Sequence, residues 1–375
     1  TRSFACDILI YDDIGINWLH HVIPTNASTT YLSTRSVIPI PWSASFWKHL
    51  LRKVLNSLRH QREPYSYIYI STLFDTFNPN IILSAYDNSP VLAKYARTNP
   101  HKKVILVQTA LRDTKSAFPK NTELPVYFSY GDADSNLLDS LYIQCKEIVP
   151  IGSVKMGIAM ETLPDTVFDE SELCFISDYR ASREIDGYTE LQKSIAQIDK
   201  VLFQHTCRYA RTNSLSLRVL SKTREQHWQK KEYEYFINLA DGLQFEFVLA
   251  NKNEKEFFTY YALLASNLII NNCSTLGFEA LAADKKVIFG ATMDSGLIPQ
   301  WGVEAYFQNM PKTIRIDELC YNHFSRRLDE LRALTDDNYS HIILSTTNDV
   351  MKTPREQSPQ NFVKSYLTNY LTNCD

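Results

Sequence analysis

The stretch Ser266–Gly290 reads SNLIINNCSTLGFEALAADKKVIFG. Its apolar run Leu268–Ile270 predicts a buried strand, and a small polar turn containing Ser274 and Thr275 follows it. We expect a helix after this turn and then a second strand at Val287–Phe289. A strand, a polar turn, a helix and a strand in this order predict a parallel βαβ unit, and therefore an α/β fold.

The polar turn of this unit carries residue types that suit a phosphate. The N-terminus of a helix offers free N–H groups and the positive end of a dipole. Hydroxyl groups add donors, a glycine lets a ligand approach the backbone closely, and a carboxylate can accept from ribose hydroxyls. We therefore predict that a nucleotide binds to Asn272, Ser274, Thr275, Gly277 and Glu279. An ordinary capped helix would explain Ser274 alone equally well.

The same alternation extends outward through the chain. We predict strands at residues 7–11, 67–70, 81–84, 104–107, 126–129, 173–177, 216–220 and 245–249. We predict helices at residues 45–60, 188–202, 228–239, 254–265 and 362–371, and another that begins at Pro90. This order favours two doubly wound, Rossmann-like domains that face a central cleft.

The stretch 148–165 lacks clear periodicity and carries two prolines and two glycines, so we place the domain boundary there. The expected parts are an acceptor-side domain at 1–158, a donor domain at 159–355 and a C-terminal helix within 356–375. Whether that helix crosses back to the first domain stays open at this point. Since ligands of doubly wound sheets bind at the carboxyl ends of the strands, residues just after strands are the site candidates.

Composition excludes several classes of function. The chain has 375 residues, 44% of them hydrophobic, and a net charge of −3, so it shows no electrostatic footprint for a nucleic-acid partner. It contains neither a Walker motif nor a Gly-x-Gly-x-x-Gly motif, and no His/Cys cluster has zinc spacing. These absences disfavour a kinase, an enzyme that uses a nicotinamide cofactor and a protein with a structural zinc site.

The seven cysteines form no Cys-x-x-Cys pair, which favours reduced thiols in a cytoplasmic protein. No apolar run approaches the ~20 residues that a membrane-spanning helix needs, and no signal peptide is visible. The basic stretch from Lys48 to Arg62 leaves peripheral contact with an inner membrane, or with an anionic acceptor, open. A solvated helix face also explains that stretch.

Five segments, taken in order, resemble the GT-B glycosyltransferases of bacterial surface-carbohydrate biosynthesis, the capsule and O-antigen branch. They are the Ser-Thr turn followed by Gly-Phe-Glu-Ala-Leu at 277–281, Tyr-Asp-Asn at 86–88, Val-Gln-Thr-Ala-Leu-Arg at 107–112, Ile-Gly-Ser-Val-Lys at 151–155 and Ile-Ser-Asp-Tyr-Arg at 176–180. The pair Thr109–Ala110 departs from the Gln-Asn-Gly that this branch often carries. The resemblance implies the GT-B fold, with two Rossmann-like domains.

The resemblance further implies transfer of a sugar from a nucleotide-sugar donor to an oligosaccharide or lipid-linked glycan acceptor, with no cofactor. Transferases of Kdo, an acidic sugar carried on CMP, lie in this neighbourhood, so CMP-Kdo is the suspected donor. The Kdo carboxylate would require cations or N–H groups besides those that bind the phosphate. The further donor-binding candidates are Gln108, Arg112, Arg180, Lys222 and Arg224.

Three aspartates that close predicted strands are the catalytic candidates. Asp178 ends the first strand of the second domain and could attack the anomeric carbon or stabilise its positive charge. Asp87 and Asp13 end strands of the first domain and could serve as the base for the acceptor hydroxyl. A capping or loop role explains each of them too.

Two further questions concern metal and reaction class. Asp132-Ala133-Asp134 resembles the Asp-x-Asp metal motif of another glycosyltransferase fold, but a GT-B site needs no metal, so we expect a plain loop and no metal ligands. A nucleotide-sugar epimerase or hydrolase on the same fold is the main alternative to a transferase. A third hypothesis is a two-domain sugar-binding protein, which the unpaired cysteines disfavour.

Overall fold

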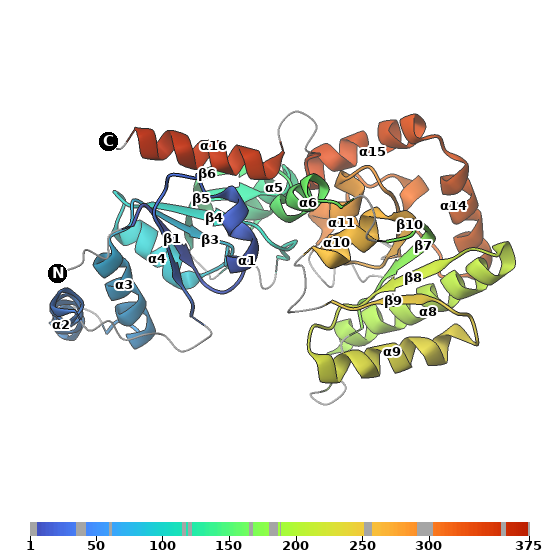
Figure 1. Cartoon of the computed structure of the whole chain (residues 1–375), viewed down its shortest axis with the longest axis horizontal. Coiled ribbons are helices and arrows are strands. Elements are labelled where there is room, and N and C mark those ends of the chain that lie inside the picture. The colour runs from blue at the N-terminus through green and yellow to red at the C-terminus, as the bar shows by residue number, and fades with distance from the viewer. Residues whose placement is uncertain are drawn as a thin grey trace.

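A computed structural model describes residues 6–34, 43–59, 62–114, 118, 122–164, 168–179, 187, 189–250, 257–290, 303–353 and 358–373. Two parallel β-sheets, each flanked by helices, lie side by side along the long axis of the molecule (Figure 1). The first sheet has the order β2-β1-β3-β4-β5-β6 and the second the order β11-β10-β7-β8-β9. Every strand pair within them is parallel.

The strands of the first sheet are β1 (Ile8–Tyr11), β2 (Thr29–Leu32), β3 (Ile81–Ser84), β4 (Lys103–Val107), β5 (Glu123–Ser129) and β6 (Gln144–Pro150). Those of the second are β7 (Ser171–Ile176), β8 (Leu217–Leu220), β9 (Glu246–Val248), β10 (Ser266–Asn271) and β11 (Lys286–Phe289). The central strands are rich in Ile, Leu and Val and are buried along nearly their whole length, as expected for parallel strands covered on both faces.

The helices of the first half are α1 (Ile16–Leu19), η1 (His20–Val22), α2 (Ala44–Arg59), α3 (Tyr65–Phe77), α4 (Pro90–Thr98), α5 (Ala133–Ser140) and α6 (Val154–Glu161). Those of the second half are α8 (Glu190–Asn213), α9 (Gln226–Ala240), α10 (Phe258–Leu264), α11 (Thr275–Ala282), α13 (Glu304–Phe307), η2 (Lys312–Ile314), α14 (Tyr321–Ala333), α15 (Asp336–Val350) and α16 (Pro359–Thr372). The predicted α/β order is confirmed. No helix among the described residues is both long and apolar enough to cross a bilayer.

The predicted strand at 67–70 is wrong, because these residues belong to helix α3. The run Tyr-Ile-Tyr-Ile alternates like a strand, but the buried positions Ile68, Ser71 and Thr72 follow the helical spacing of three and four. The stretch 148–165, expected to be irregular, holds the end of β6 and the whole of α6. Strands β2 and β6 and helices α1, α5, α6, α14 and α15 were not predicted at all.

Each sheet changes winding direction once. In the second sheet the chain runs from β7 outward to β8 and β9, and then returns to the other side of β7 for β10 and β11. The register pairs Asn271 at the end of β10 with Ile176 at the end of β7. The loops that follow β7 and β10 therefore start side by side and diverge, which is the position where open α/β sheets bind ligands.

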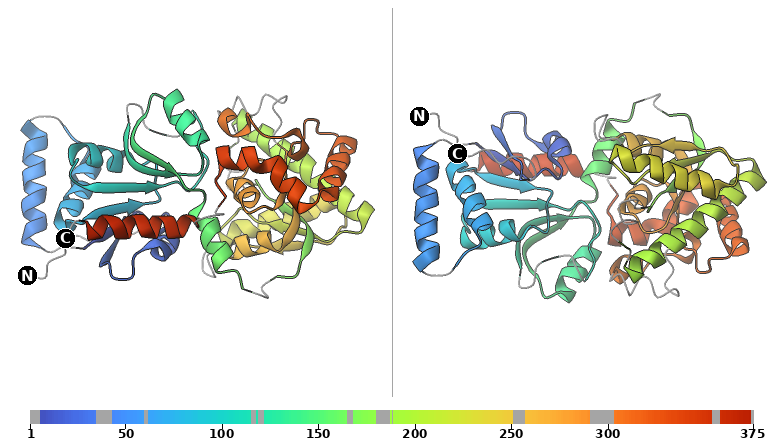
Figure 2. Two further views of the ribbon diagram at one scale, coloured as in Figure 1. Left: turned by 90° about the horizontal axis from the view of Figure 1, so that it is seen from above. Right: turned by 90° about the horizontal axis from the view of Figure 1, so that it is seen from below.

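Helix α16 packs on the first sheet, although it is the last element of the chain (Figure 2). The rings of Phe362 and Tyr366 lie edge-on to Phe128 of β5, with centroids 6.0 and 5.1 Å away. The Tyr366 hydroxyl also donates a 2.9 Å hydrogen bond to Glu147 of β6.

Buried polar contacts join the two halves. The Ser153 hydroxyl donates to Glu279 of α11 at 2.5 Å, and the Tyr306 hydroxyl of α13 donates to Asp134 of α5 at 2.7 Å. A third contact joins the loop after β4 to the start of α11 through the N–H of Leu111, which donates to Thr275 Oγ1 at 3.2 Å. These bonds fix the two sheets relative to each other next to the carboxyl ends of their strands.

Candidate functional site

A cavity of about 350 Å³ lies at the point where the second sheet changes winding direction. Its walls come from the loops after β7, β8 and β10, from the first turns of α8 and from the loop after β4 of the first sheet. The lining residues are Ala110, Leu111, Asp178, Leu191, Gln192, Ile195, Ala196, Lys222, Cys273, Ser274 and Thr275. The cavity therefore combines one acid, one base and a run of small polar residues with an apolar wall.

Asp178 and Lys222 form an ion pair on the wall of the cavity. Asp178 lies two residues beyond β7, and Lys222 lies two residues beyond β8. The carboxylate also accepts from the backbone N–H and the Sγ of Cys273, at 3.4 and 3.2 Å. The Asp178 side chain is only 3% exposed while that of Lys222 is 31% exposed, so the ammonium group is the more accessible partner.

Asp199 of α8 lies directly behind Asp178. Its Oδ1 accepts from the backbone N–H of Asp178 at 3.3 Å. Burial, together with the nearby charge of Asp178, raises the pKa of Asp199 well above its usual range, so its protonated form is favoured. Burial also raises the pKa of Cys273 well above its usual range, and Asp178 adds to the effect, so Cys273 is held as a thiol.

Glu232 of α9 holds together the two loops that carry the ion pair. One carboxylate oxygen accepts from Ser177 Oγ at 2.6 Å and from the N–H of Lys222 at 2.9 Å. The other accepts from Ser221 Oγ at 2.7 Å and from the N–H of Thr223 at 3.0 Å. Since Glu232 is fully buried, these donors compensate for the loss of its hydration and fix both loops.

The turn after β10 is braced from within the strand. Asn271 Oδ1 accepts from the N–H of Ser274 at 3.1 Å, and its Nδ2 donates to the Ser274 carbonyl at 3.2 Å. Ser274 is the N-cap residue of α11, but its side chain makes no capping hydrogen bond. The capped-helix interpretation therefore does not account for its hydroxyl, which lines the cavity beside Thr275.

Asn272 lies beneath this turn and does not line the cavity. Its Nδ2 donates to the carbonyl of Ile195 at 3.1 Å, which ties the turn to α8. Its Oδ1 is buried and has no hydrogen-bond partner among the described residues. A buried amide oxygen without a hydrogen-bond partner is energetically costly.

Two residues of the predicted nucleotide set have other roles in this structure. A Cβ at Gly277 would lie 2.1 Å from Nδ2 of Asn271, so packing against that side chain is by itself enough to require the glycine. Glu279 is 2% exposed and accepts from Ser153 and from the Tyr260 hydroxyl, the latter at 3.0 Å. The structure does not support its expected contact with ribose, because its buried carboxylate accepts hydrogen bonds that join the two halves.

Three candidates of the first half, Asp87, Gln108 and Arg112, lie in buried polar networks and do not line the cavity. The Arg112 guanidinium pairs with both carboxylate oxygens of Asp87, and the Tyr127 hydroxyl donates to the same carboxylate at 3.1 Å. Burial raises the pKa of Asp87, an effect that Arg112 opposes. A buried, ion-paired carboxylate that does not line the cavity is poorly placed to take a proton from an acceptor, so the geometry does not support Asp87 as the base.

Gln108 belongs to the same region. Its Nε2 donates to Asp134 at 2.8 Å, while its Oε1 accepts from the N–H of Tyr130 at 2.7 Å. Burial raises the pKa of Asp134 to about 6, and the hydrogen bonds from Tyr306 and Gln108 oppose this rise. Gln108 and Arg112 are therefore structural residues of the junction in this conformation, and neither reaches the cavity.

The remaining candidates are dispersed. Asp13 accepts from the Ser33 hydroxyl at 2.8 Å, at the carboxyl end of β1. Arg224 is exposed on the loop after β8, and Arg180 lies outside the described residues. Asp132 is exposed at the start of α5, whereas Asp134 is buried and hydrogen-bonded, so the two do not converge as metal ligands. Within the described ranges, no group of three acidic, His or Cys side chains is arranged to hold a metal ion.

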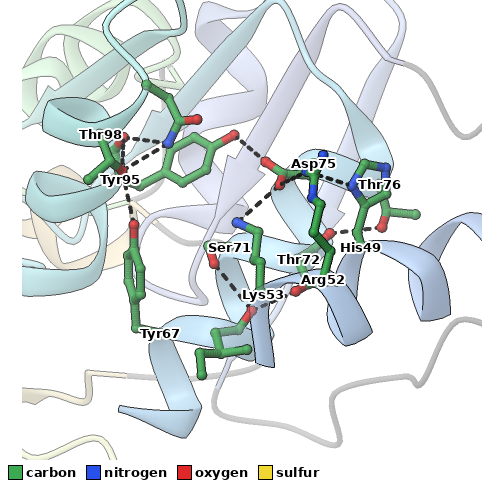
Figure 3. A network of polar contacts seen from close by, with 12 residues as sticks. His49, Arg52, Lys53, Tyr67, Ser71, Thr72, Asp75, Thr76, Tyr95 and Thr98 are labelled. Carbon is green, nitrogen blue, oxygen red and sulfur yellow. Dashed lines mark hydrogen bonds and ion pairs between the residues drawn. The ribbon is translucent and has the colours of Figure 1, made fainter. Parts of the chain in front are cut away.

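A second hollow, of about 640 Å³, lies at the far end of the first half between α2, α3 and α4. The polar side chains beside it are already partnered: Lys53 pairs with Asp75, and the Ser71 hydroxyl donates to the backbone carbonyl of Ile68 (Figure 3). It lies away from the carboxyl ends of the second sheet. We therefore take the smaller cavity as the candidate active site, because its position follows from the sheet topology.

A sequence family described as "putative O-antigen biosynthesis protein" matches residues 113–369. This match spans more than half of the chain and includes every residue of the second sheet. The chain belongs to this O-antigen biosynthesis family. A search of curated proteins finds no match to it.

Solved structures similar to this O-antigen biosynthesis family member share its fold at low sequence identity. UDP-GlcNAc 2-epimerase from Methanocaldococcus jannaschii superposes with a TM-score of 0.53 at 12% identity, over 98% of this chain and 99% of the epimerase. A glycosyltransferase from Rickettsia africae gives 0.52 at 11% identity, over 98% of both chains. The wall teichoic acid polymerase TagF gives 0.53 at 10%, over all of this chain and 91% of the polymerase. The predicted two-domain GT-B fold is confirmed.

Sequence reasoning missed two residues that shape the site of this family member. Asp199 lies within the apolar stripe of α8, four residues after Ile195 and three before Leu202. Glu232 lies four residues before the buried Phe236 on the inner face of α9. An acid in the apolar stripe of a predicted helix is the signal that could have identified both.

Proposed function

We propose that this chain is a glycosyltransferase that moves a sugar from a nucleotide-activated donor to a glycan or lipid-linked acceptor of surface polysaccharide synthesis. The observation that carries the proposal is the cavity where the second sheet changes winding direction, with Asp178, Lys222 and the turn 273–275 on its walls. Membership of the O-antigen biosynthesis family and the GT-B fold support the same reaction class.

The residues on the cavity wall divide between two tasks in this proposal. The donor phosphates would lie against Ser274, Thr275 and the start of α11, where hydroxyl groups and the helix dipole favour an anion. Lys222 would neutralise the phosphate that leaves with the electron pair of the broken glycosidic bond. Asp178 would face the anomeric carbon, where a carboxylate stabilises positive charge or forms a covalent intermediate.

For the donor we propose CMP-Kdo, a prediction that rests on the sequence resemblance alone. The sugar carboxylate would need a cation besides the one that meets the phosphate. Among the described cavity-lining residues Lys222 is the only cation, and Arg224 lies two residues further along the same loop. A UDP-hexosamine, whose sugar carries no carboxylate, is the natural competitor in the test.

The experiment measures release of free nucleotide with and without a glycan acceptor, for CMP-Kdo and UDP-GlcNAc in parallel. A transferase releases nucleotide and loses donor sugar only when the acceptor is present. Conversion of the donor without any acceptor would instead indicate the epimerase or hydrolase alternative. A thermal-shift panel of CMP, UDP, GDP and TDP precedes it, since a nucleotide at 100 times its dissociation constant adds about 2.7 kcal/mol of stability.

A further inference from the structure

Helix α2 exposes a stripe of large apolar side chains. Trp47, Leu51, Leu55 and Leu58 are 48%, 61%, 43% and 73% exposed. They are spaced by four, four and three residues, which places them on one face of the helix. We call these four residues the α2 stripe. No other helix of the described ranges exposes more than two large apolar side chains.

A row of cations borders the α2 stripe. Lys48, Arg52 and Arg59 are exposed, and each directly follows a stripe residue in the sequence, so all three lie along the same border. We call them the basic row. The helix contains no acidic residue, whereas the whole chain has a net charge of −3. The positive charge is therefore concentrated beside exposed apolar surface.

The opposite face of α2 is fixed to the protein. Phe46 is buried and packs edge-on against Tyr69 of α3, with ring centroids 5.8 Å apart. Lys53 pairs with Asp75 of α3 at 3.0 Å, and Asp75 also accepts from the Tyr95 hydroxyl of α4 at 3.1 Å (Figure 3). These contacts determine which face of α2 is turned inward, so the exposure of the stripe follows from the packing.

Helix α2 also forms the end of the molecule that lies farthest from the second sheet (Figures 1 and 2). The stripe is thus displayed on an outer edge, where a flat surface can reach it without meeting the catalytic half. An exposed apolar face of this kind indicates an interaction surface.

We propose that α2 lies in the headgroup layer of an anionic lipid bilayer and docks the protein there. In such a layer the α2 stripe would enter the boundary of the acyl chains, and the basic row would meet lipid phosphates. Trp47 suits this depth because tryptophan concentrates at membrane–water interfaces. A second copy of the chain is the less favourable partner, since it would oppose two helices that carry cations and no acid.

The test is sedimentation of the whole protein with vesicles of phosphatidylglycerol mixed with phosphatidylcholine, and with phosphatidylcholine alone. We expect binding to the anionic vesicles that weakens as salt is added. The stripe variant Leu51→Gln/Leu55→Gln/Leu58→Gln should bind at least about tenfold more weakly, because glutamine keeps the helix and removes apolar area. The row variant Lys48→Gln/Arg59→Gln should lose the preference for the anionic vesicles.

Helix α9 supplies matched controls. Tyr233→Gln/Ile237→Gln removes exposed apolar groups and Lys230→Gln/Lys231→Gln removes exposed cations, and neither pair should change vesicle binding. All positions changed are exposed, so every variant should remain folded, which thermal unfolding checks. The proposal is overturned by absence of binding to the anionic vesicles, by unchanged binding of the stripe variant, or by a concentration-dependent dimer that the stripe variant abolishes.

Discussion

The carboxylate of Glu232 accepts a 2.6 Å hydrogen bond from Ser177 Oγ, although the two residues are 55 positions apart. Ser177 directly precedes Asp178, and the same carboxylate accepts from the N–H of Lys222. Glu232 therefore positions both members of the ion pair on the cavity wall. It makes these contacts from the inner face of α9, behind the site and out of reach of any substrate.

We predict that Glu232→Gln lowers both stability and turnover. Each carboxylate oxygen accepts from a backbone N–H, so the amide nitrogen of glutamine must face an N–H donor in either orientation. An unsatisfied buried group of this kind costs about 1–3 kcal/mol. Urea unfolding and kcat measure the two effects. Glu234→Gln, on the exposed side of the same helix, is the control and should leave both unchanged.

Asp178→Asn should lower kcat by at least ~100-fold while nucleotide affinity changes little. The change keeps the shape and removes the charge, so the loss is confined to the transition state and corresponds to about 2.7 kcal/mol. Asp199→Asn is the matched comparison, because asparagine resembles the protonated form that burial already favours there. It should alter kcat much less. Near-normal turnover of Asp178→Asn would assign Asp178 a structural role and move attention to Asp13.

Asp134 should make stability depend on pH. Its pKa is about 6 in the folded protein against an ordinary value of 3.8, so the folded state binds the proton more tightly. The resulting stabilisation is fully present below pH 3.8 and is lost as the pH rises through 6, a total of about 3 kcal/mol at 1.36 kcal/mol per unit. Asp134→Asn should remove this dependence.

The measurement is urea unfolding of Asp134→Asn and of the parent protein across this pH range. Asp132→Asn changes an exposed neighbouring carboxylate and serves as the control. Its free energy of unfolding should vary with pH as that of the parent protein does. If the free energy of unfolding varied with pH in the same way for the parent and for Asp134→Asn, the pKa of Asp134 would be the same in the folded and unfolded states, and the prediction would be wrong.

We predict that activity survives EDTA. The phosphate would be met by Lys222, the hydroxyls of the turn and the dipole of α11, which together replace a divalent ion. The check is nucleotide release in EDTA, and again after Mg²⁺ or Mn²⁺ is restored. Activity that disappears with EDTA and returns with a divalent ion would overturn the prediction and make Asp132→Asn and Asp134→Asn the next variants to assay.

The alternation of strands and helices, and with it the α/β class, could be predicted because buried parallel strands leave short, uninterrupted apolar runs. The position of Asp178, Lys222 and Thr275 could be predicted for the same reason, since each follows such a run closely. Glu279 could not be placed, because its partner Ser153 lies 126 residues away. The prediction of a strand at 67–70 failed because these four residues alternate like a strand. Only the residues after them show the helical spacing of buried positions.

The position of α16 has a consequence for synthesis of the chain. Strand β5 is made early, yet the packing around Phe128 is complete only when Phe362 and Tyr366 of α16 reach it. The first sheet cannot complete its core as it emerges from the ribosome, and the part of its apolar face that α16 covers stays exposed while the whole second half is translated. Contacts across more than 200 positions, such as that of Tyr366 with Glu147, also slow folding because a long loop must close first. The amino-terminal half is therefore the part of the newborn chain most in need of chaperone protection.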